Sequence, residues 1–164
     1  MSKIIVSACL LCCECRYDGK KKPHQQVIDL SEKHVLIPIC PEQMGGLPTP
    51  RIPSEVSGDK VINSEGKDVT NEYHKGATMA LNIAKLIATK IALLKAKSPS
   101  CGKGKIYDGT FSSQLIDGNG ITVRLFLENG IEVYTENEIN EIEKRLANDQ
   151  CHYVKILIIE ERYM

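Results

Sequence analysis

The sequence has no tryptophan, two phenylalanines and no excess of either charge, because 21 basic residues balance 21 acidic ones. Nucleic-acid-binding proteins usually need a basic surface or a set of stacking rings, and the composition provides neither. The chain also lacks an apolar run long enough to cross a bilayer or to form a signal peptide. We therefore expect a cytoplasmic protein without nucleic-acid or membrane partners.

The pattern of apolar runs predicts an α/β fold. The 164 residues suffice for a single domain with a substantial core, predicted to span residues 1–164. Runs at 3–9, 35–39, 91–94 and 131–134 indicate strands, whereas 25–33, 70–90, 121–127 and 136–147 indicate helices. Residues 57–68 indicate an excursion of the chain or a hairpin. Because strands and helices alternate, we expect a mainly parallel, Rossmann-like sheet flanked by helices.

Three local signals refine this prediction. Thr70 is expected to cap the longest helix, with Glu72 in its first turn. Proline and glycine are so dense in residues 40–50 that we expect a rigid loop without regular structure. An apolar segment at 153–159 predicts a last strand, either at the sheet edge or paired with a second copy in a homodimer.

Seven cysteines are many for a cytoplasmic protein of this length. Disulfides are rare in that compartment, so clustered cysteines indicate metal binding or catalysis. Cys9, Cys40 and Cys101 each follow an apolar strand, and the carboxyl ends of parallel strands share one edge of a sheet. Structural zinc usually takes four ligands, whereas a catalytic iron–sulfur cluster can accept three cysteines and keep one iron for a substrate. The three cysteines fit the cluster better.

A second arrangement of cysteines is local. Cys9, Cys12 and Cys15 have the two-residue spacing of a ferredoxin loop, with Cys13 beside them, although the later Cys-x3-Cys-Pro element is missing. Such a loop could hold a cluster or a zinc ion with one remote ligand. Cys151 stands alone and is assigned no site role.

Polar residues near the strand-end cysteines are candidates for catalysis. Glu42 lies two residues after Cys40, where a carboxyl in a partly dry crevice can act as general acid or base. Ser98 lies three residues before Cys101, either to position substrate or to cap a turn. The cations that could orient a planar polar substrate, or simply form surface ion pairs, are Arg16, Arg51 and Lys103.

Four groups of motifs resemble the thiouracil desulfidase (TudS) family over roughly residues 3–135. They are Val6-Ser-Ala-Cys-Leu-Leu11 with Arg16-Tyr-Asp-Gly19, Cys40-Pro-Glu42 with Gly46-Leu-Pro-Thr-Pro-Arg51, Asp68-Val-Thr70 with Gly76-Ala77, and Ser98-Pro-Ser-Cys-Gly102 with Ile106-Tyr-Asp-Gly-Thr-Phe111. Two cysteines depart from the pattern: the family usually has glycine at the position of Cys12, and Cys13 is not part of its motif.

The resemblance implies an enzyme with a 4Fe–4S cluster on Cys9, Cys40 and Cys101, whose fourth iron is open to the sulfur of a thiolated pyrimidine base. It assigns catalysis to Glu42 and Ser98, and the desulfuration it implies is not a redox reaction. The alternative from a different class is a non-enzymatic module that binds a metal or a cluster with the Cys9–Cys15 loop.

Overall fold

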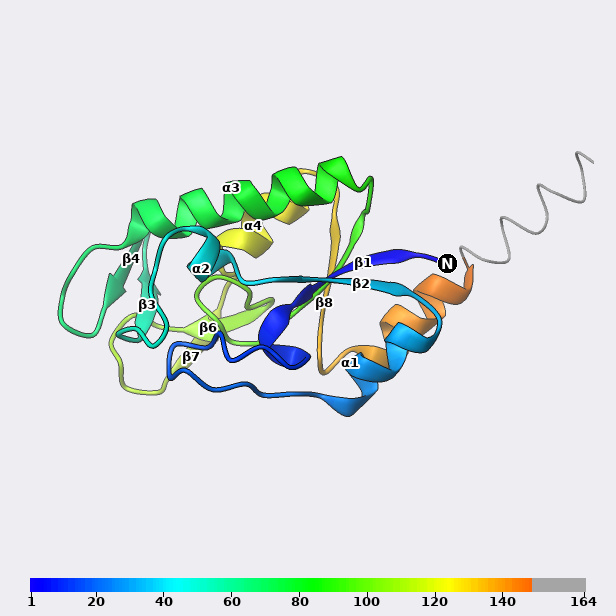
Figure 1. Ribbon diagram of the computed structural model, residues 1–164. Coiled ribbons are helices and arrows are strands. Elements are labelled where there is room, and N and C mark those ends of the chain that lie inside the picture. Colours follow the sequence, from blue (N-terminus) through cyan, green and yellow to red (C-terminus); the bar gives the residue numbers. More distant parts are fainter. Residues whose placement is uncertain (149–164) are drawn as a thin grey trace, which may run out of the picture.

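The structure, a computed structural model, describes residues 1–148. The segment predicted as a strand at 153–159 lies outside the described residues, as does Cys151, so the homodimer and a single domain over 1–164 stay predictions. The centre of the molecule is a four-stranded, fully parallel sheet in the order β2–β1–β5–β8 (Figure 1). Its strands are β1 (Lys3–Ser7), β2 (Val35–Ile39), β5 (Ile91–Leu94) and β8 (Glu132–Thr135).

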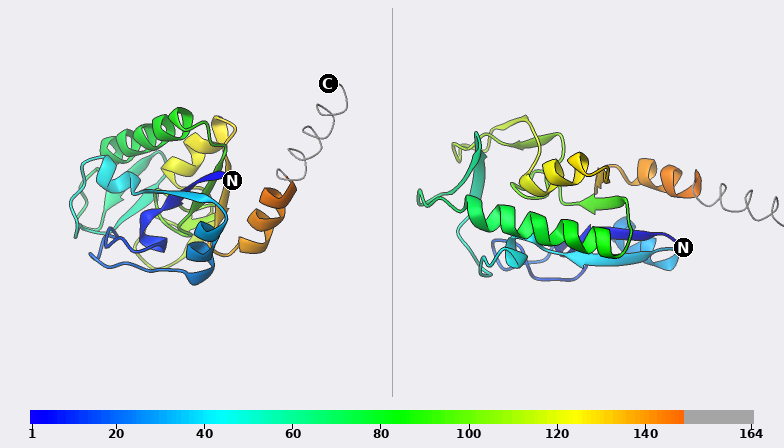
Figure 2. Two further views of the ribbon diagram at one scale, coloured as in Figure 1. Left: turned by 45° about the vertical axis from the view of Figure 1, so that its right-hand side comes forward. Right: turned by 90° about the horizontal axis from the view of Figure 1, so that it is seen from above.

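Helices cover both faces of this sheet. On one face lie α3 (Thr70–Leu86) and α4 (Ile121–Glu128), and on the other lie α1 (Gln25–Asp29), the 3-10 turn η2 (Leu30–Glu32) and a helix at 139–148 (Figure 2). The fold class predicted from the alternating runs is therefore confirmed.

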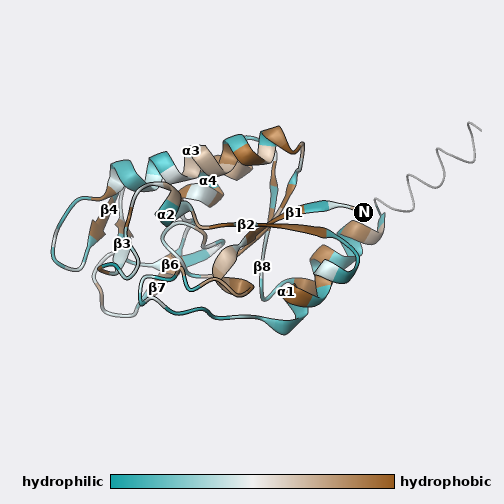
Figure 3. Ribbon diagram, viewed as in Figure 1, coloured by the Kyte–Doolittle hydropathy of each residue, from teal (hydrophilic) through white to brown (hydrophobic). Residues whose placement is uncertain are grey.

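Side-chain alternation along the strands explains the two layers. In β1, Ile4 and Val6 pack with α1 and helix 139–148, whereas Ile5 points to the opposite face and packs with α3 and α4. Successive residues of a strand point to opposite faces, so a fully apolar strand is buried on both sides. The edge strand β2 is coloured apolar along its length (Figure 3), but of its residues only Ile39 is buried.

Two small hairpins lie beyond the main sheet. The first, β3 (Ser54–Ser57) with β4 (Lys60–Asn63), confirms the predicted hairpin but begins earlier along the chain. The second, β6 (Lys105–Tyr107) with β7 (Leu115–Asp117), was not predicted. Both pack on a third apolar cluster that includes Val56, Tyr73 and Ile106.

The start and end of α3 differ from the prediction. Thr70 is not the N-cap, because it is already the first helical residue and its hydroxyl oxygen accepts the Val61 N–H at 2.9 Å. Asp68 instead accepts the Thr70 N–H at 3.0 Å. The helix ends at Leu86 rather than near residue 90, since Ala88 has a φ of 54°.

Two further boundaries need correction. The segment after Cys40 is not wholly irregular, because Pro41–Met44 form the one-turn helix α2, and proline is well tolerated at a first helical position. The last described helix begins at residue 139 rather than at Glu136. In the turn before this helix, Glu138 accepts the N–H of Thr135 at 2.9 Å.

Among residues 1–148, no helix is both long and apolar enough to cross a membrane.

Candidate functional site

The carboxyl ends of β1, β2 and β5 open into one cavity of about 600 Å³. These three strands are neighbours in the sheet, and their register places Ser7 of β1 opposite Ile39 of β2. Cys9, Cys40 and Cys101, each of which follows one of these strands, all line the cavity. The three strand-end cysteines therefore lie at the same edge of the sheet, as their sequence positions predicted.

A separate local structure carries each of the three cysteines. Cys9 lies in the 3-10 turn η1 (Ala8–Leu10), directly after β1. Cys40 is the N-cap residue of α2. Cys101 follows a turn in which the Ser98 hydroxyl oxygen accepts the backbone N–H of Ser100 at 3.1 Å and of Cys101 at 3.0 Å. Cys9 and Cys101 are buried, and Cys40 is partly exposed.

Cys15 is a fourth cysteine in this cavity, and sequence reasoning did not single it out from the local loop. Its side chain is buried and hydrogen-bonds to the thiols of Cys9 and Cys40, and its carbonyl oxygen accepts the Cys40 thiol at 3.6 Å. In contrast, Cys12 is exposed and Cys13 is partly exposed. The loop therefore turns Cys15, but not Cys12, toward the strand ends.

Three of these thiols, those of Cys15, Cys40 and Cys101, have a raised pKa. Burial raises the pKa of Cys101 to about 12. A hydrogen bond from Cys40 lowers the pKa of Cys15, but a hydrogen bond with Cys9 and burial outweigh it and raise that pKa to about 11. The hydrogen bond with Cys15, followed by burial, also raises the pKa of Cys40. Thiolates at these three positions therefore require a compensating positive charge.

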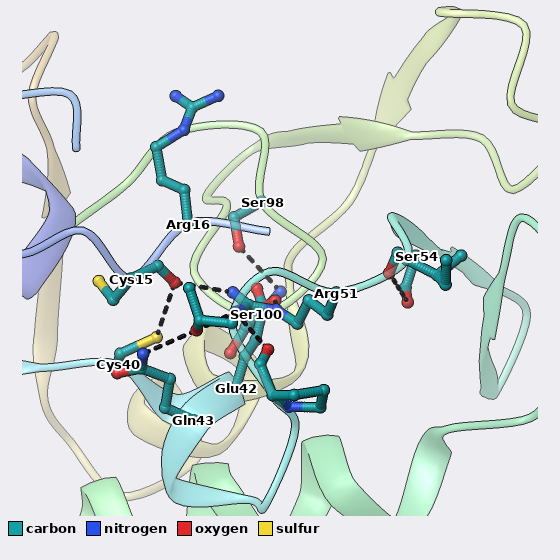
Figure 4. Close-up of polar contacts among 12 residues, drawn as sticks. Cys15, Arg16, Cys40, Glu42, Gln43, Arg51, Ser54, Ser98 and Ser100 are labelled. Carbon is teal, nitrogen blue, oxygen red and sulfur yellow. Dashed lines mark hydrogen bonds and ion pairs between the residues drawn. The ribbon is translucent and has the colours of Figure 1, made fainter. Parts of the chain in front are cut away.

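Glu42 faces the same cavity from the first turn of α2. Its Oε2 accepts the Nε–H of Arg51 at 2.6 Å, and the two side chains are 12% and 6% exposed. Tyr73 of α3 lies beside this pair. Burial, and next the charge of Glu42, raise the pKa of Tyr73, so its hydroxyl stays protonated. Figure 4 shows Glu42, Arg51 and Cys40 converging below the loop of Cys15.

The far wall of the cavity comes from the loops after β5 and β8. Lys95 forms an ion pair with Glu136, and Glu136 also accepts the Ala96 N–H at 2.8 Å. Sequence reasoning missed Glu136, although it directly follows the carboxyl end of a strand, the same signal that identified the cysteines.

The candidate cations occupy different positions. Arg16 lines the cavity and forms an ion pair with Asp18 at 3.2 Å. Arg51 also lines the cavity, but its guanidinium group is bound to the protein. Lys103 is not among the residues of the cavity wall, because it pairs with Glu138 at 2.6 Å and stacks on Tyr134.

Within residues 1–148, no group of three or more histidine, cysteine or acidic side chains could hold a single metal ion. The cysteines share a cavity, and Cys15 hydrogen-bonds to Cys9 and Cys40, but their spacing does not match that of ligands on one ion. This spacing argues against a mononuclear site made by described residues, whether from the strand ends or from the Cys9–Cys15 loop.

Comparison with known proteins gives consistent results. Residues 4–138 match the sequence profile of a family described as 2-thiouracil desulfurase. The chain is 40% identical over 149 residues to the uncharacterized protein YbbK of Bacillus subtilis (strain 168), with 85% of this chain and 99% of that protein covered. It also resembles the solved structure of a 4Fe–4S-dependent thiouracil desulfidase, TudS, with a TM-score of 0.83 and 40% identity over 90% of this chain and 99% of the other. The chain therefore belongs to the 2-thiouracil desulfurase family.

Proposed function

We propose that this protein is an enzyme that removes sulfur from a thiolated pyrimidine base, with a 4Fe–4S cluster held by Cys9, Cys40 and Cys101. The observation that carries the proposal is the meeting of three strand-end cysteines at one cavity. The name of the similar TudS structure, a 4Fe–4S-dependent thiouracil desulfidase, supports both the cofactor and the substrate class. We propose further that it acts in the cytoplasm, where free thiols stay reduced.

The chemistry of the donors fits such a cluster. Iron–sulfur clusters are bound by cysteine thiolates, each on a different iron, so the ligands need not converge on one point. This agrees with thiols that share a cavity but form no mononuclear site among the described residues. The raised pKa of Cys101 fits as well, because bound iron supplies the positive charge that keeps a buried thiol deprotonated.

When bound, the cluster would supply an iron without a protein ligand, to which the substrate sulfur can coordinate. The overall reaction replaces C=S by C=O: 2-thiouracil and water give uracil and hydrogen sulfide, with no change of oxidation state. Overall, the attacking water loses both of its protons and the departing sulfur gains two. Glu42, largely buried and beside the Cys40 position, is suited to exchange these protons as a general acid–base.

Ser98 is suited to a second role in the cavity. Its oxygen already accepts two backbone N–H groups, so its hydroxyl hydrogen is directed elsewhere. In both hydrogen bonds that Ser98 forms within residues 1–148, its hydroxyl oxygen is the acceptor, and the hydroxyl hydrogen is donated in neither. We propose that this hydroxyl donates to the polar edge of the bound base or to the attacking water.

The test is turnover by protein reconstituted anaerobically with iron and sulfide. Incubation with 2-thiouracil should release sulfide and uracil in equal amounts, measured by a colorimetric sulfide assay and by chromatography of the base. Protein kept free of iron is the control and should release neither product.

Two results would contradict the proposal. One is fully loaded protein that releases no sulfide from 2-thiouracil, 4-thiouracil or other thiolated pyrimidines. The other is release of sulfide in the absence of iron, because the cluster would then have no part in the reaction.

A further inference from the structure

The guanidinium group of Arg51 forms an unusual number of contacts for a cavity-lining side chain. Its Nε donates to Glu42 Oε2 at 2.6 Å, and its Nη2 donates to the carbonyl oxygen of Cys15 at 3.0 Å. Its Nη1 donates to the carbonyl oxygen of Pro48 at 3.3 Å and to the Thr49 hydroxyl at 3.2 Å. Four of the five N–H donors of the group therefore bind the protein itself.

These contacts exclude one role that the sequence suggested for Arg51. A planar substrate is held by an arginine through two parallel N–H groups, and Arg51 has at most one left. The side chain is also only 6% exposed. Arg51 therefore cannot present its fork to a bound base.

The contacts indicate a different role. Glu42 is nearly buried, so the direction of its carboxyl group depends on the groups packed around it. Arg51 binds one of its two oxygens, Oε2, which fixes the rotamer of Glu42. The Cys15 carbonyl oxygen that accepts from Arg51 also accepts the Cys40 thiol at 3.6 Å. One guanidinium group thus connects the carboxylate to the loop whose Cys15 carbonyl oxygen contacts Cys40 (Figure 4).

We propose that Arg51 is a positioning residue for this reaction: it holds Glu42 in its reactive orientation and fixes the Cys15 loop relative to α2, without touching the substrate. This inference rests on the proposed function for its catalytic consequence. The contact between Arg51 and Glu42 can be tested without it.

The first experiment is a double-mutant cycle on the cluster-free protein. Arg51→Met and Glu42→Gln should each lower the melting temperature by about 10 °C, because each leaves half of a buried ion pair. The melting temperature of the double variant should fall no further than that of the less stable single variant. Arg145→Met, which breaks the more exposed pair with Glu132 outside the cavity, is the matched control and should shift the melting temperature by about 2 °C or less.

The second experiment measures kinetics on reconstituted protein. Arg51→Met should lower kcat about 100-fold and leave KM within about threefold, because a misplaced acid–base group slows chemistry rather than binding. Arg51→Lys should recover part of kcat and serves as the second variant if Arg51→Met does not fold. In the Glu42→Gln background, Arg51→Met should lower kcat no further at equal iron content.

The outcomes separate the two claims. A raised KM with normal kcat would overturn the inference, because Arg51 would then bind substrate. Additive losses in kcat, or additive changes in melting temperature, would overturn it as well. If the wild-type loaded protein releases no sulfide, the proposed function fails, and the melting cycle on cluster-free protein still decides whether Arg51 holds Glu42.

Discussion

Gly76 of α3 lies directly against the carbonyl oxygen of Pro41 in α2: a Cβ atom at Gly76 would be 1.8 Å from that oxygen. The contact is reciprocal, because a Cβ at Gly45, just after α2, would be 1.9 Å from the carbonyl oxygen of Glu72 in α3. Two backbones can approach so closely only when both positions lack a side chain. Since Glu42 is the second residue of α2, this contact sets the depth of its carboxylate in the cavity.

Gly76→Ala is therefore expected to push α2 away from α3. We predict a loss of about 3 kcal/mol in the free energy of unfolding, at the upper end of overpacking effects. Turnover should fall at equal iron content, since Glu42 moves with α2. Denaturant unfolding and sulfide release measure the two effects. Asn82→Ala, an exposed change on the same helix, is the control and should alter neither. A Gly76→Ala protein of normal stability would show that the two helices can separate without cost.

Glu42→Gln should keep the fold and the cluster but lose most turnover. Glutamine retains the shape of the side chain and cannot exchange a proton, and general acid–base groups typically contribute about 10²–10⁴-fold. Iron content, visible absorbance and sulfide release should be compared with those of Glu128→Gln, the same change on the exposed part of α4. Near-normal turnover in cluster-loaded Glu42→Gln would remove this carboxylate from the mechanism.

The sheet and the meeting of the cysteines were predictable because both depend on local patterns. A run such as Ile91–Leu94 is apolar at every position, and such runs form strands buried on both faces. Cysteines that follow parallel strands must reach the same edge of the sheet, whatever the length of the loops between them. Three residues far apart in the sequence could thus be grouped without knowing any contact.

The positions of Cys15 and Arg51 were not predictable because they depend on long-range contacts. The loop that carries Cys15 is held partly by the backbone N–H of Arg51, which donates to the backbone carbonyl oxygen of Tyr17 at 2.8 Å. The spacing of apolar residues in the sequence does not indicate a contact between two irregular segments. The short helix α2 was missed because it begins with Pro41 and is followed at once by Gly45 and Gly46, which suppress any helical signal, whereas its packing on Gly76 stabilises it.

Ser98→Ala tests whether this residue acts only as a turn cap. The change leaves the backbone N–H groups of Ser100 and Cys101 without their acceptor, so we expect a loss of about 1 kcal/mol in stability. If the hydroxyl also donates to substrate or water, turnover per loaded cluster should fall too. Thermal melting and sulfide release on the same samples separate the effects. Unchanged turnover with reduced stability would leave Ser98 as a cap alone.

Glu138→Gln should destabilise the protein at neutral pH but not in acid. Burial alone would raise the pKa of Glu138, but the hydrogen bond with Lys103 and the bonds to Thr135 outweigh it and hold the pKa below its usual value. A carboxyl with a lowered pKa stabilises the fold above its unfolded pKa of about 4.3, and that contribution disappears as pH falls through the lower, folded pKa. Melting temperatures of both proteins should therefore differ at pH 7 and approach each other near pH 3. An equal difference at both values would assign the effect to shape rather than charge.

The last prediction decides between the two arrangements of cysteines. If the cluster spans three strand ends, each of Cys9, Cys40 and Cys101 supplies a ligand that no nearby residue replaces. Alanine variants at these positions should then purify without iron absorbance. The double variant Cys12→Ser with Cys13→Ser should still bind about four irons per chain, because neither residue lines the cavity.

Cys15 sharpens this test, because it is the loop cysteine that contacts the proposed ligands. If it only packs against Cys9 and Cys40, Cys15→Ala should still load about four irons per chain, although the cluster should be lost faster in air through the space left beside it. If the loop itself holds the metal, Cys12 and Cys15 are both required, and either Cys40 or Cys101 can be removed without bleaching the protein. Iron and sulfide counts after anaerobic reconstitution therefore distinguish the two arrangements, because a variant that keeps its cluster under one arrangement loses it under the other. A colourless double variant at Cys12 and Cys13 would overturn the strand-end assignment, since thiols outside the cavity can matter only to a site built by the loop.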